Sequence, residues 1–238
     1  MLYHLALILI GPVLFLQGKH VKRVTPKLPE PEGHRYGQLG QGKELSLLIV
    51  GDSAAAGVGV EHQQQALSGR LVAALSKTNA VRWKLIAQSG DTSRQLLDRL
   101  HAMPQEEFDT AVVSIGVNDV TGLNRASAWA ENVRLIVQLL TEKFGVRKVY
   151  LSCIPPMHLF PALPNPLRWW LGLRAKQFNV LMSAVAESER SSIYVAIPYS
   201  GDLAGIAADG FHPGAEAYTV WGDYVAELIQ RDVDEQTG

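Results

Sequence analysis

The chain of 238 residues lacks the features that identify several common classes of protein. Its only cysteine is Cys153, so the chain forms no disulfide within itself and offers no thiol cluster for zinc or an iron–sulfur centre. It lacks an excess of either charge, with 22 basic and 23 acidic residues, so we expect no nucleic-acid partner. None of its seven histidines forms an H-x-H or H-E-x-x-H pattern. We therefore expect neither a metal site nor a cofactor.

The start of the chain also lacks acidic residues, the first of which is Glu30. Residues 1–17 are apolar almost throughout, and lysines and arginines lie between them and Glu30. A cleaved signal peptide has basic residues ahead of its apolar run and small residues at a cleavage site after it, and both features are missing. We therefore expect no cleaved, secreted product.

We expect residues 1–17 to form an apolar helix that anchors the chain to a membrane. The run is shorter than the roughly 20 residues that span a bilayer and Gly11-Pro12 interrupts it, but it is apolar all round. If it spans, its basic flank predicts a bacterial-type inner-membrane location with the rest of the chain on the cytoplasmic side. The alternative is a cytoplasmic protein whose terminal helix packs on the globular body or on another copy. Residues 18–43, rich in proline and glycine, predict an extended tether.

The remaining residues, 44–238, predict one α/β domain. Apolar runs typical of buried strands lie at 45–50, 81–87, 109–115, 146–153 and 192–197. Stretches with helical spacing lie at 64–77, 93–102, 125–144, 167–190 and 214–231. This alternation predicts a three-layer α/β/α sandwich with a five-stranded parallel sheet. In such sheets ligands bind beyond the carboxyl ends of the strands.

Glycines and polar residues come shortly after the first three predicted strands, and a fourth such group comes after the loop that follows the fifth strand. In chain order they are Gly51-Asp52-Ser53, Gly90, Asn118-Asp119, and Asp209 with His212. Each alone is also typical of a helix cap or a turn. Four such groups at one edge of one sheet favour a shared site.

This ordered set resembles the motifs of the SGNH hydrolases, also called the GDSL esterase/lipase family, especially their bacterial esterase, thioesterase and lysophospholipase branch. The resemblance covers about residues 45–231 and implies that family's flavodoxin-like sheet. Its blocks are Gly51-Asp52-Ser53, Gly90, Gly116-x-Asn118-Asp119 and Asp209-x-x-His212. Two departures stand out: Ala54 occupies the position of the leucine in the family name, and Ala87-Gln88 lies where an asparagine often precedes the glycine.

The resemblance implies a serine esterase that acts through an acyl-enzyme on a small acyl ester. A serine hydroxyl is a poor nucleophile without a positioned base, and the base needs an orienting partner. Ser53 is the candidate nucleophile, His212 the base and Asp209 the acid. Asp202 is a less favoured acid, ten residues before His212. The G-x-S-x-G elbow of the α/β-hydrolases is absent around Ser53.

The same resemblance implies donors for the oxyanion that forms during ester cleavage. They are the backbone N–H groups of Ser53 and Gly90 and the side-chain amide of Asn118. Asp52 and Asp119 are interpreted as residues that fix the turn and the amide.

The segment 154–172, rich in proline and large apolar residues, follows the fourth predicted strand. It predicts either a rigid loop packed on the body, or the lining of an acyl channel or a membrane-facing surface. The candidate substrate contacts are Met157, Leu159, Phe160, Trp169 and Trp170. With them we expect esters of short to medium acyl chains. Acyl transfer, thioester or lysophospholipid hydrolysis on the same site, and a non-catalytic membrane-tethered binding protein are the alternatives.

Overall fold

The computed structural model of the protein describes residues 2–199 and 205–235, with side chains described from residue 10 onward. The described chain forms a six-stranded mixed sheet in the order β1-β3-β2-β4-β5-β6. The strands are β1 (Tyr36–Leu39), β2 (Lys43–Gly51), β3 (Asn79–Ala87), β4 (Thr110–Ser114), β5 (Lys148–Ser152) and β6 (Ser192–Val195). Strands β2 to β6 are parallel to one another, and β1 pairs antiparallel with β3 at the edge. The expected five parallel strands are confirmed, and β1 adds to them.

Strand β2 shows why these segments form strands. Its residues from Leu47 to Val50 are fully buried, although successive side chains point to opposite faces of the sheet. A parallel sheet covered by helices on both faces needs such continuous apolar runs.

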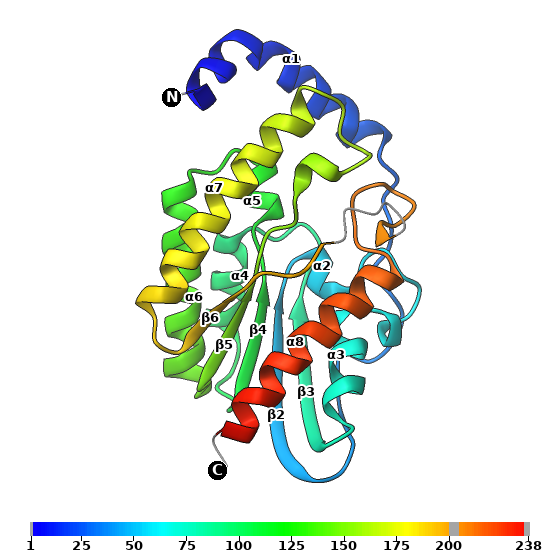
Figure 1. Ribbon diagram of the computed structural model, residues 1–238, viewed down its shortest axis with the longest axis vertical. Coiled ribbons are helices and arrows are strands. Elements are labelled where there is room, and N and C mark those ends of the chain that lie inside the picture. Colours follow the sequence, from blue (N-terminus) through cyan, green and yellow to red (C-terminus); the bar gives the residue numbers. More distant parts are fainter. Residues whose placement is uncertain (1, 200–204, 236–238) are drawn as a thin grey trace.

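Helices cover both faces of this sheet, as Figure 1 shows. On one face lie α4 (Ser93–Ala102), α6 (Ala126–Phe144) and α7 (Leu167–Ser188), and on the other α3 (Leu67–Leu75) and α8 (Ala215–Glu235). The short helices are α2 (Ser53–Ala56), η1 (Gln63–Gln65), α5 (Val117–Thr121) and η2 (Met157–Leu159). Each face of the sheet shares a separate hydrophobic core with its helices. The expected three-layer sandwich is confirmed.

The segment over residues 18–43 differs from the extended tether that we expected. Helix α1 (Leu2–Val24) continues past residue 17, and Tyr36–Leu39 form β1. Backbone pairing with β3 holds this short strand, from Tyr36 opposite Lys84 to Leu39 opposite Val81. Its side chains are mostly exposed, so no apolar alternation in the sequence indicates a strand there.

The second half of α1 packs against the start of α7. Leu14 is buried there, the Gln17 amide donates to the carbonyl of Asn165 at 2.7 Å, and its oxygen accepts from the N–H of Leu167 at 3.0 Å. Among the described residues, no helix is both long enough and apolar enough to cross a membrane. The first half of the expected anchor, residues 1–9, lies outside the described side chains.

Candidate active site

Ser53 lies at the sharp turn between β2 and α2. Gly51 ends β2 and lies opposite Ser114, the last residue of β4. A side chain at Gly51 would place its Cβ 2.0 Å from the carbonyl oxygen of Ser114, so only glycine fits there. Asp52 caps α2, because its carboxylate accepts from the N–H of Ala54 at 3.1 Å. The backbone N–H of Asp52 donates to the carbonyl of Ser114 at 3.1 Å. The turn therefore presents the half-buried Ser53 hydroxyl at the carboxyl edge of the sheet.

The loop before α8 brings His212 and Asp209 to this hydroxyl. His212 Nε2 lies 3.0 Å from Ser53 Oγ, and His212 Nδ1 lies 2.5 Å from Asp209 Oδ2. The other oxygen of Asp209 accepts from the N–H groups of Phe211 and His212, at 3.0 Å each. The Asp209 side chain is fully buried, whereas the imidazole of His212 remains 20% exposed. Two segments distant in sequence, the turn of Ser53 and the loop of Asp209 and His212, thus meet in one hydrogen-bonded row.

The contacts of Asp209 decide its charge. Burial alone would raise its pKa, but the hydrogen bonds from the His212 ring and from the N–H groups of His212 and Phe211 outweigh it and hold the pKa below the ordinary value. Because an ionised carboxylate only accepts hydrogen bonds, Nδ1 of His212 carries the hydrogen. In the neutral imidazole, Nε2 is then free to accept the proton of Ser53.

Gly90 and Asn118 lie in linked segments beside Ser53. Gly90 has a φ of +90°, which L side chains rarely adopt, and a Cβ there would meet nothing within 4 Å. The amide Nδ2 of Asn118 donates one hydrogen to the carbonyl of Asp91, at 2.9 Å, and keeps a second one. Within the part of the chain that the structure describes, the N–H groups of Ser53 and Gly90 have no acceptor. These three donors are available to an anion.

Asp119 and Asp52 bond to groups other than the Ser53 hydroxyl. The buried carboxylate of Asp119 accepts from the N–H of Ser93 at 2.8 Å and from the hydroxyl of Ser93 at 2.9 Å, and these bonds connect α5 to the start of α4. It also accepts from the amide of Asn124 at 2.9 Å. Burial raises the pKa of Asp52 to about 7, against the smaller opposing effect of the Ala54 N–H. One carboxyl thus fixes the helix of Asn118, and the other fixes the turn of Ser53.

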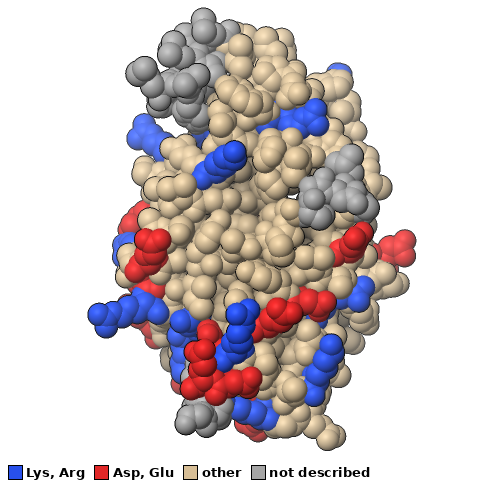
Figure 2. All heavy atoms as spheres, in the orientation of Figure 1, with Lys and Arg blue, Asp and Glu red and all other residues tan. Residues whose placement is uncertain are grey.

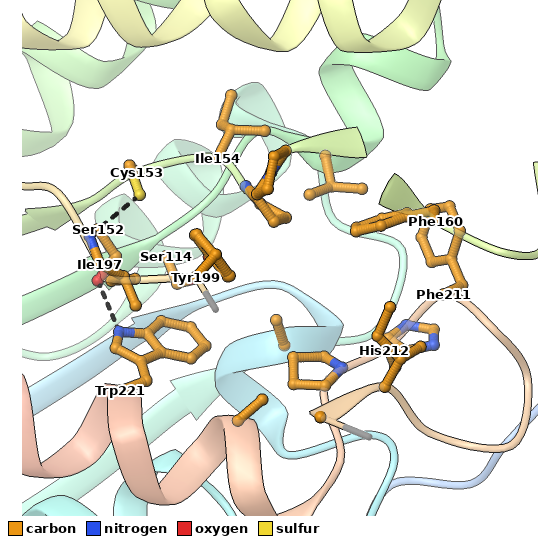
Figure 3. A pocket seen from close by; sticks show the side chains of 18 of the residues that line it. Ser114, Ser152, Cys153, Ile154, Phe160, Ile197, Tyr199, Phe211, His212 and Trp221 are labelled. Carbon is orange, nitrogen blue, oxygen red and sulfur yellow. Dashed lines mark hydrogen bonds between the residues drawn. The ribbon is translucent and has the colours of Figure 1, made fainter. Parts of the chain in front are cut away.

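A cavity of about 390 Å³ opens beside Ser53 and extends over the ends of β4, β5 and β6. Its apolar lining includes Ile115, Ile154, Phe160, Ile197, Val220 and Trp221. Figure 3 shows His212, Phe211 and Phe160 at one end, and Trp221, Cys153 and Ile197 at the other.

Two polar N–H groups at the far end of this cavity are paired with neighbouring side chains. The indole N–H of Trp221 donates to the hydroxyl of Ser152 at 3.1 Å, and the N–H of Ile197 donates to Cys153 Sγ at 3.4 Å. The far end therefore presents mainly apolar surface to a ligand.

The structure places only two of the five candidate substrate contacts at the cavity. Leu159 and Phe160 line the cavity. The expectation is wrong for Met157 and Trp170, which are buried in the core at 0% and 2% exposure, because apolar composition indicates burial without saying which side a chain faces. Trp169 is 44% exposed and lies outside the cavity.

Sequence reasoning missed other lining residues, above all Val220 and Trp221 on α8. Their signal was the helical spacing with Ala217, which also lines the cavity. The alternative acid, Asp202, lies outside the described residues.

A model of the GDSL-like Lipase/Acylhydrolase family matches residues 49–220. The chain belongs to this family. The resemblance drawn from the four sequence blocks is thereby confirmed.

Individual proteins support the same relationship. The GDSL-like esterase Rv1075c of Mycobacterium tuberculosis is 27% identical over 206 residues, which cover 81% of this chain and 64% of that protein. The structure of TesA has a TM-score of 0.61 and 25% identity, covering 78% of this chain and 98% of TesA.

A more distant structure shows the fold alone. A carbohydrate esterase family 2 enzyme with a carbohydrate-binding domain, from Corynascus thermopiles (Myceliophthora fergusii), has a TM-score of 0.65 at 15% identity. The match covers 88% of this chain and 69% of that one.

Proposed function

We propose that the protein hydrolyses carboxylic esters of short to medium acyl chains through an acyl-enzyme on Ser53. The observation that carries the proposal is the row from Ser53 Oγ to His212 Nε2 at 3.0 Å and on to the buried carboxylate of Asp209. Membership of a lipase/acylhydrolase family supports the same chemistry.

In the proposed reaction, Ser53 Oγ attacks the ester carbonyl carbon while its proton passes to His212 Nε2. The N–H groups of Ser53 and Gly90 and the amide of Asn118 bind the negative charge that forms on the carbonyl oxygen. His212 returns the proton to the departing alcohol, which leaves the acyl group on Ser53. Water, deprotonated by the same imidazole, then attacks the acyl carbon. The bond from the acyl carbon to Ser53 Oγ breaks, His212 returns the proton to Oγ, and the acid leaves. Asp209 stays ionised and stabilises the charged ring.

The cavity supports the proposed chain length. Ligand pockets range from about 300 to 1,000 Å³, and a volume of about 390 Å³ lies near the lower end of that range. Because the cavity starts at Ser53 and has an apolar lining, a bound acyl chain would lie along it toward Trp221.

Hydrolysis of p-nitrophenyl esters from acetate to laurate tests this proposal. We expect kcat/KM to peak at a short or medium chain, and Ser53→Ala to lower it by roughly 10⁴- to 10⁶-fold. Parallel assays with acyl thioesters, with lysophospholipids and with an added alcohol acceptor separate the alternative reactions on the same residues. Near-normal turnover by Ser53→Ala would contradict the proposal, as would a wild-type protein that cleaves none of these substrates.

We also propose that the α1 end of the molecule binds a membrane surface that contains anionic lipids. One stripe of α1, including Leu14, faces the body, but Val13, Phe15 and Leu16 on the rest of the helix are 46%, 63% and 66% exposed. Exposed apolar side chains beside lysines and arginines are typical of helices that lie in the membrane interface.

The charge distribution supports an anionic partner. Lys19, Lys22 and Arg23 are exposed in the last turns of α1, and no acidic residue precedes Glu30. Figure 2 shows only lysine and arginine among the coloured charged residues at the upper end, where α1 lies, with aspartate and glutamate farther down this face.

Sedimentation with lipid vesicles tests the membrane proposal. We expect the full-length protein to sediment with phosphatidylcholine vesicles that contain phosphatidylglycerol, and Leu16→Ser to reduce the bound fraction several-fold. Val180→Ser is the matched control, because Val180 is 69% exposed on α7. Absence of wild-type binding, or equal losses in the two variants, would count against it.

A further inference from the structure

The segment after α1 reaches the loop that carries Gly90. One carboxylate oxygen of Glu30 accepts from the N–H of Ser89 at 2.8 Å and from its hydroxyl at 2.7 Å. The other oxygen accepts from the guanidinium of Arg35 at 2.6 Å, and Arg35 also donates to the carbonyl of Ala87 at 2.8 Å. Glu30 and Arg35 therefore hold the chain immediately before Gly90.

The residue after Gly90 is held just as firmly. The N–H of Asp91 donates to the carbonyl of Gln88 at 3.2 Å, and its buried carboxylate pairs with Arg99 at 2.9 Å. Its carbonyl accepts from the amide of Asn118. Gly90 itself is exposed, and no atom lies within 4 Å of the position of a Cβ. The position of its N–H thus depends on Ser89 and Asp91 and little on packing.

This loop lies next to the turn of Ser53. Gly51 pairs with Ala87 in register, and the N–H of Gln88 donates to the carbonyl of Gly51 at 3.2 Å. A shift of the loop would therefore move the Gly90 N–H relative to Ser53.

We infer that Glu30 and Arg35 are positioning residues for the proposed ester hydrolysis, because they fix the Gly90 N–H where the oxyanion forms. This inference rests on the proposed function. Preorganised donors lower the barrier only if they are aimed at the developing charge, and a misplacement of about 1 Å can cost about 100-fold in rate.

The charges of the pair fit such a role. A carboxylate near a developing oxyanion would raise the barrier, but the guanidinium of Arg35 offsets the charge of Glu30. The side chains of Arg35 and Glu30 are 37% and 34% exposed, and ion pairs with that exposure contribute little to stability. Loss of the pair should therefore change the rate more than the folding.

The experiment measures kcat, KM and the Ki of an alkyl trifluoromethyl ketone, which forms a tetrahedral adduct with a serine, in the full-length protein. We expect Glu30→Ala to lower kcat by about 10- to 100-fold, with KM within about twofold and Ki raised by the same factor as kcat falls. Glu30→Gln should keep more of the wild-type kcat than Glu30→Ala, because its amide oxygen still accepts from Ser89 and only the bond from Arg35 is lost. The matched control is Glu32→Ala, an exposed glutamate two residues away whose side chain makes no hydrogen bond to the described residues.

If Glu30→Ala does not fold, Glu30→Asp asks the same question, because it keeps the charge and withdraws the carboxylate by one methylene; a fall in kcat and a rise in Ki are again expected. Wild-type kcat and Ki in the folded variant would overturn the inference and leave the esterase intact. A fall in kcat without a matching rise in Ki would overturn it too. A wild-type protein without ester hydrolysis would contradict the proposed function and this inference together.

Discussion

The two sides of Ser53 along the sheet differ in kind. On the β3 side, the loop of residues 88–91 is polar: Glu30 accepts from its Ser89, and Arg99 and Asn118 donate to its Asp91. Arg35 donates to the carbonyl of Ala87, directly before the loop. On the other side, over β4 to β6, lies a cavity with a mainly apolar lining, in which the Trp221 indole and the Ile197 N–H are paired with neighbouring side chains.

This difference indicates that the two sides have different roles in the proposed reaction. Charge develops at the carbonyl oxygen of an ester and requires rigid donors, whereas an acyl chain requires only apolar surface of the right size. The polar side should therefore determine the rate for every substrate, and the apolar side should discriminate among chains.

Removal of the base should have the largest effect on kcat, and it should leave the preference among acyl chain lengths unchanged. We expect His212→Ala to lower kcat by roughly 10⁴- to 10⁶-fold and Asp209→Asn by about 10⁴-fold, because the amide no longer orients the imidazole. Rates measured over the whole series of p-nitrophenyl esters should fall by one common factor. Turnover within tenfold of wild type in His212→Ala would contradict this role.

Removal of a donor on the polar side should have the next largest effect. Asn118→Ala should lower kcat by about 10²- to 10³-fold for all chain lengths, because the oxyanion loses one preorganised donor. Asn118→Asp, which puts a carboxylate at the same place, should be lower still. If the loss in Asn118→Ala depended strongly on chain length, the two sides would not be separate.

The buried carboxyl of Asp52 should affect stability. Burial raises its pKa from 3.8 to about 7, so the folded state binds this proton more tightly than the unfolded state. The contribution of Asp52 to the free energy of unfolding is complete below pH 4 and is lost as the pH rises through about 7. We expect urea unfolding to show wild type losing about 2–3 kcal/mol more than Asp52→Asn between pH 5 and pH 8. Equal pH dependence of the two proteins would rule out this effect.

Asp209 behaves in the opposite sense. Its pKa is lowered in the folded state, so its contribution to stability is present above the ordinary pKa of an aspartate and is lost as the pH falls through the lowered value. The window between pH 5 and pH 8 lies above both values and separates the two carboxyls.

A change on the apolar side should have the smallest effect and the most selective one. Val220→Phe adds bulk to the cavity, so we expect kcat/KM for the octanoyl ester to fall about tenfold while the acetyl ester changes little. Val180→Phe, on an exposed face of α7, is the control. Equal losses for both esters would show that the cavity does not hold the acyl chain.

The sequence predicted the five parallel strands and the four blocks because both are local signals. Buried runs such as Leu47 to Val50 indicate their own strand, and the carboxyl ends of parallel strands meet at one edge. We expected Ser53, Asp209 and His212 to converge from that rule together with the resemblance to the motifs of the family.

The rest depended on pairings between distant segments. Strand β1 is held by backbone bonds to β3, and Glu30 meets Ser89 across 59 positions, so neither leaves a periodic pattern. Met157 and Trp170 illustrate another limit, because their apolar character is equally compatible with the core and with the cavity.

A crystal structure of the protein after reaction with a p-nitrophenyl alkylphosphonate tests most directly whether the oxyanion and the acyl chain bind on opposite sides of Ser53. We predict phosphorus bonded to Ser53 Oγ, one phosphonyl oxygen within hydrogen-bond distance of the Gly90 N–H and the Asn118 amide, and the alkyl chain in the cavity toward Trp221. Phosphorus on another residue, or an alkyl chain lying over the loop of residues 88–91, would contradict the account.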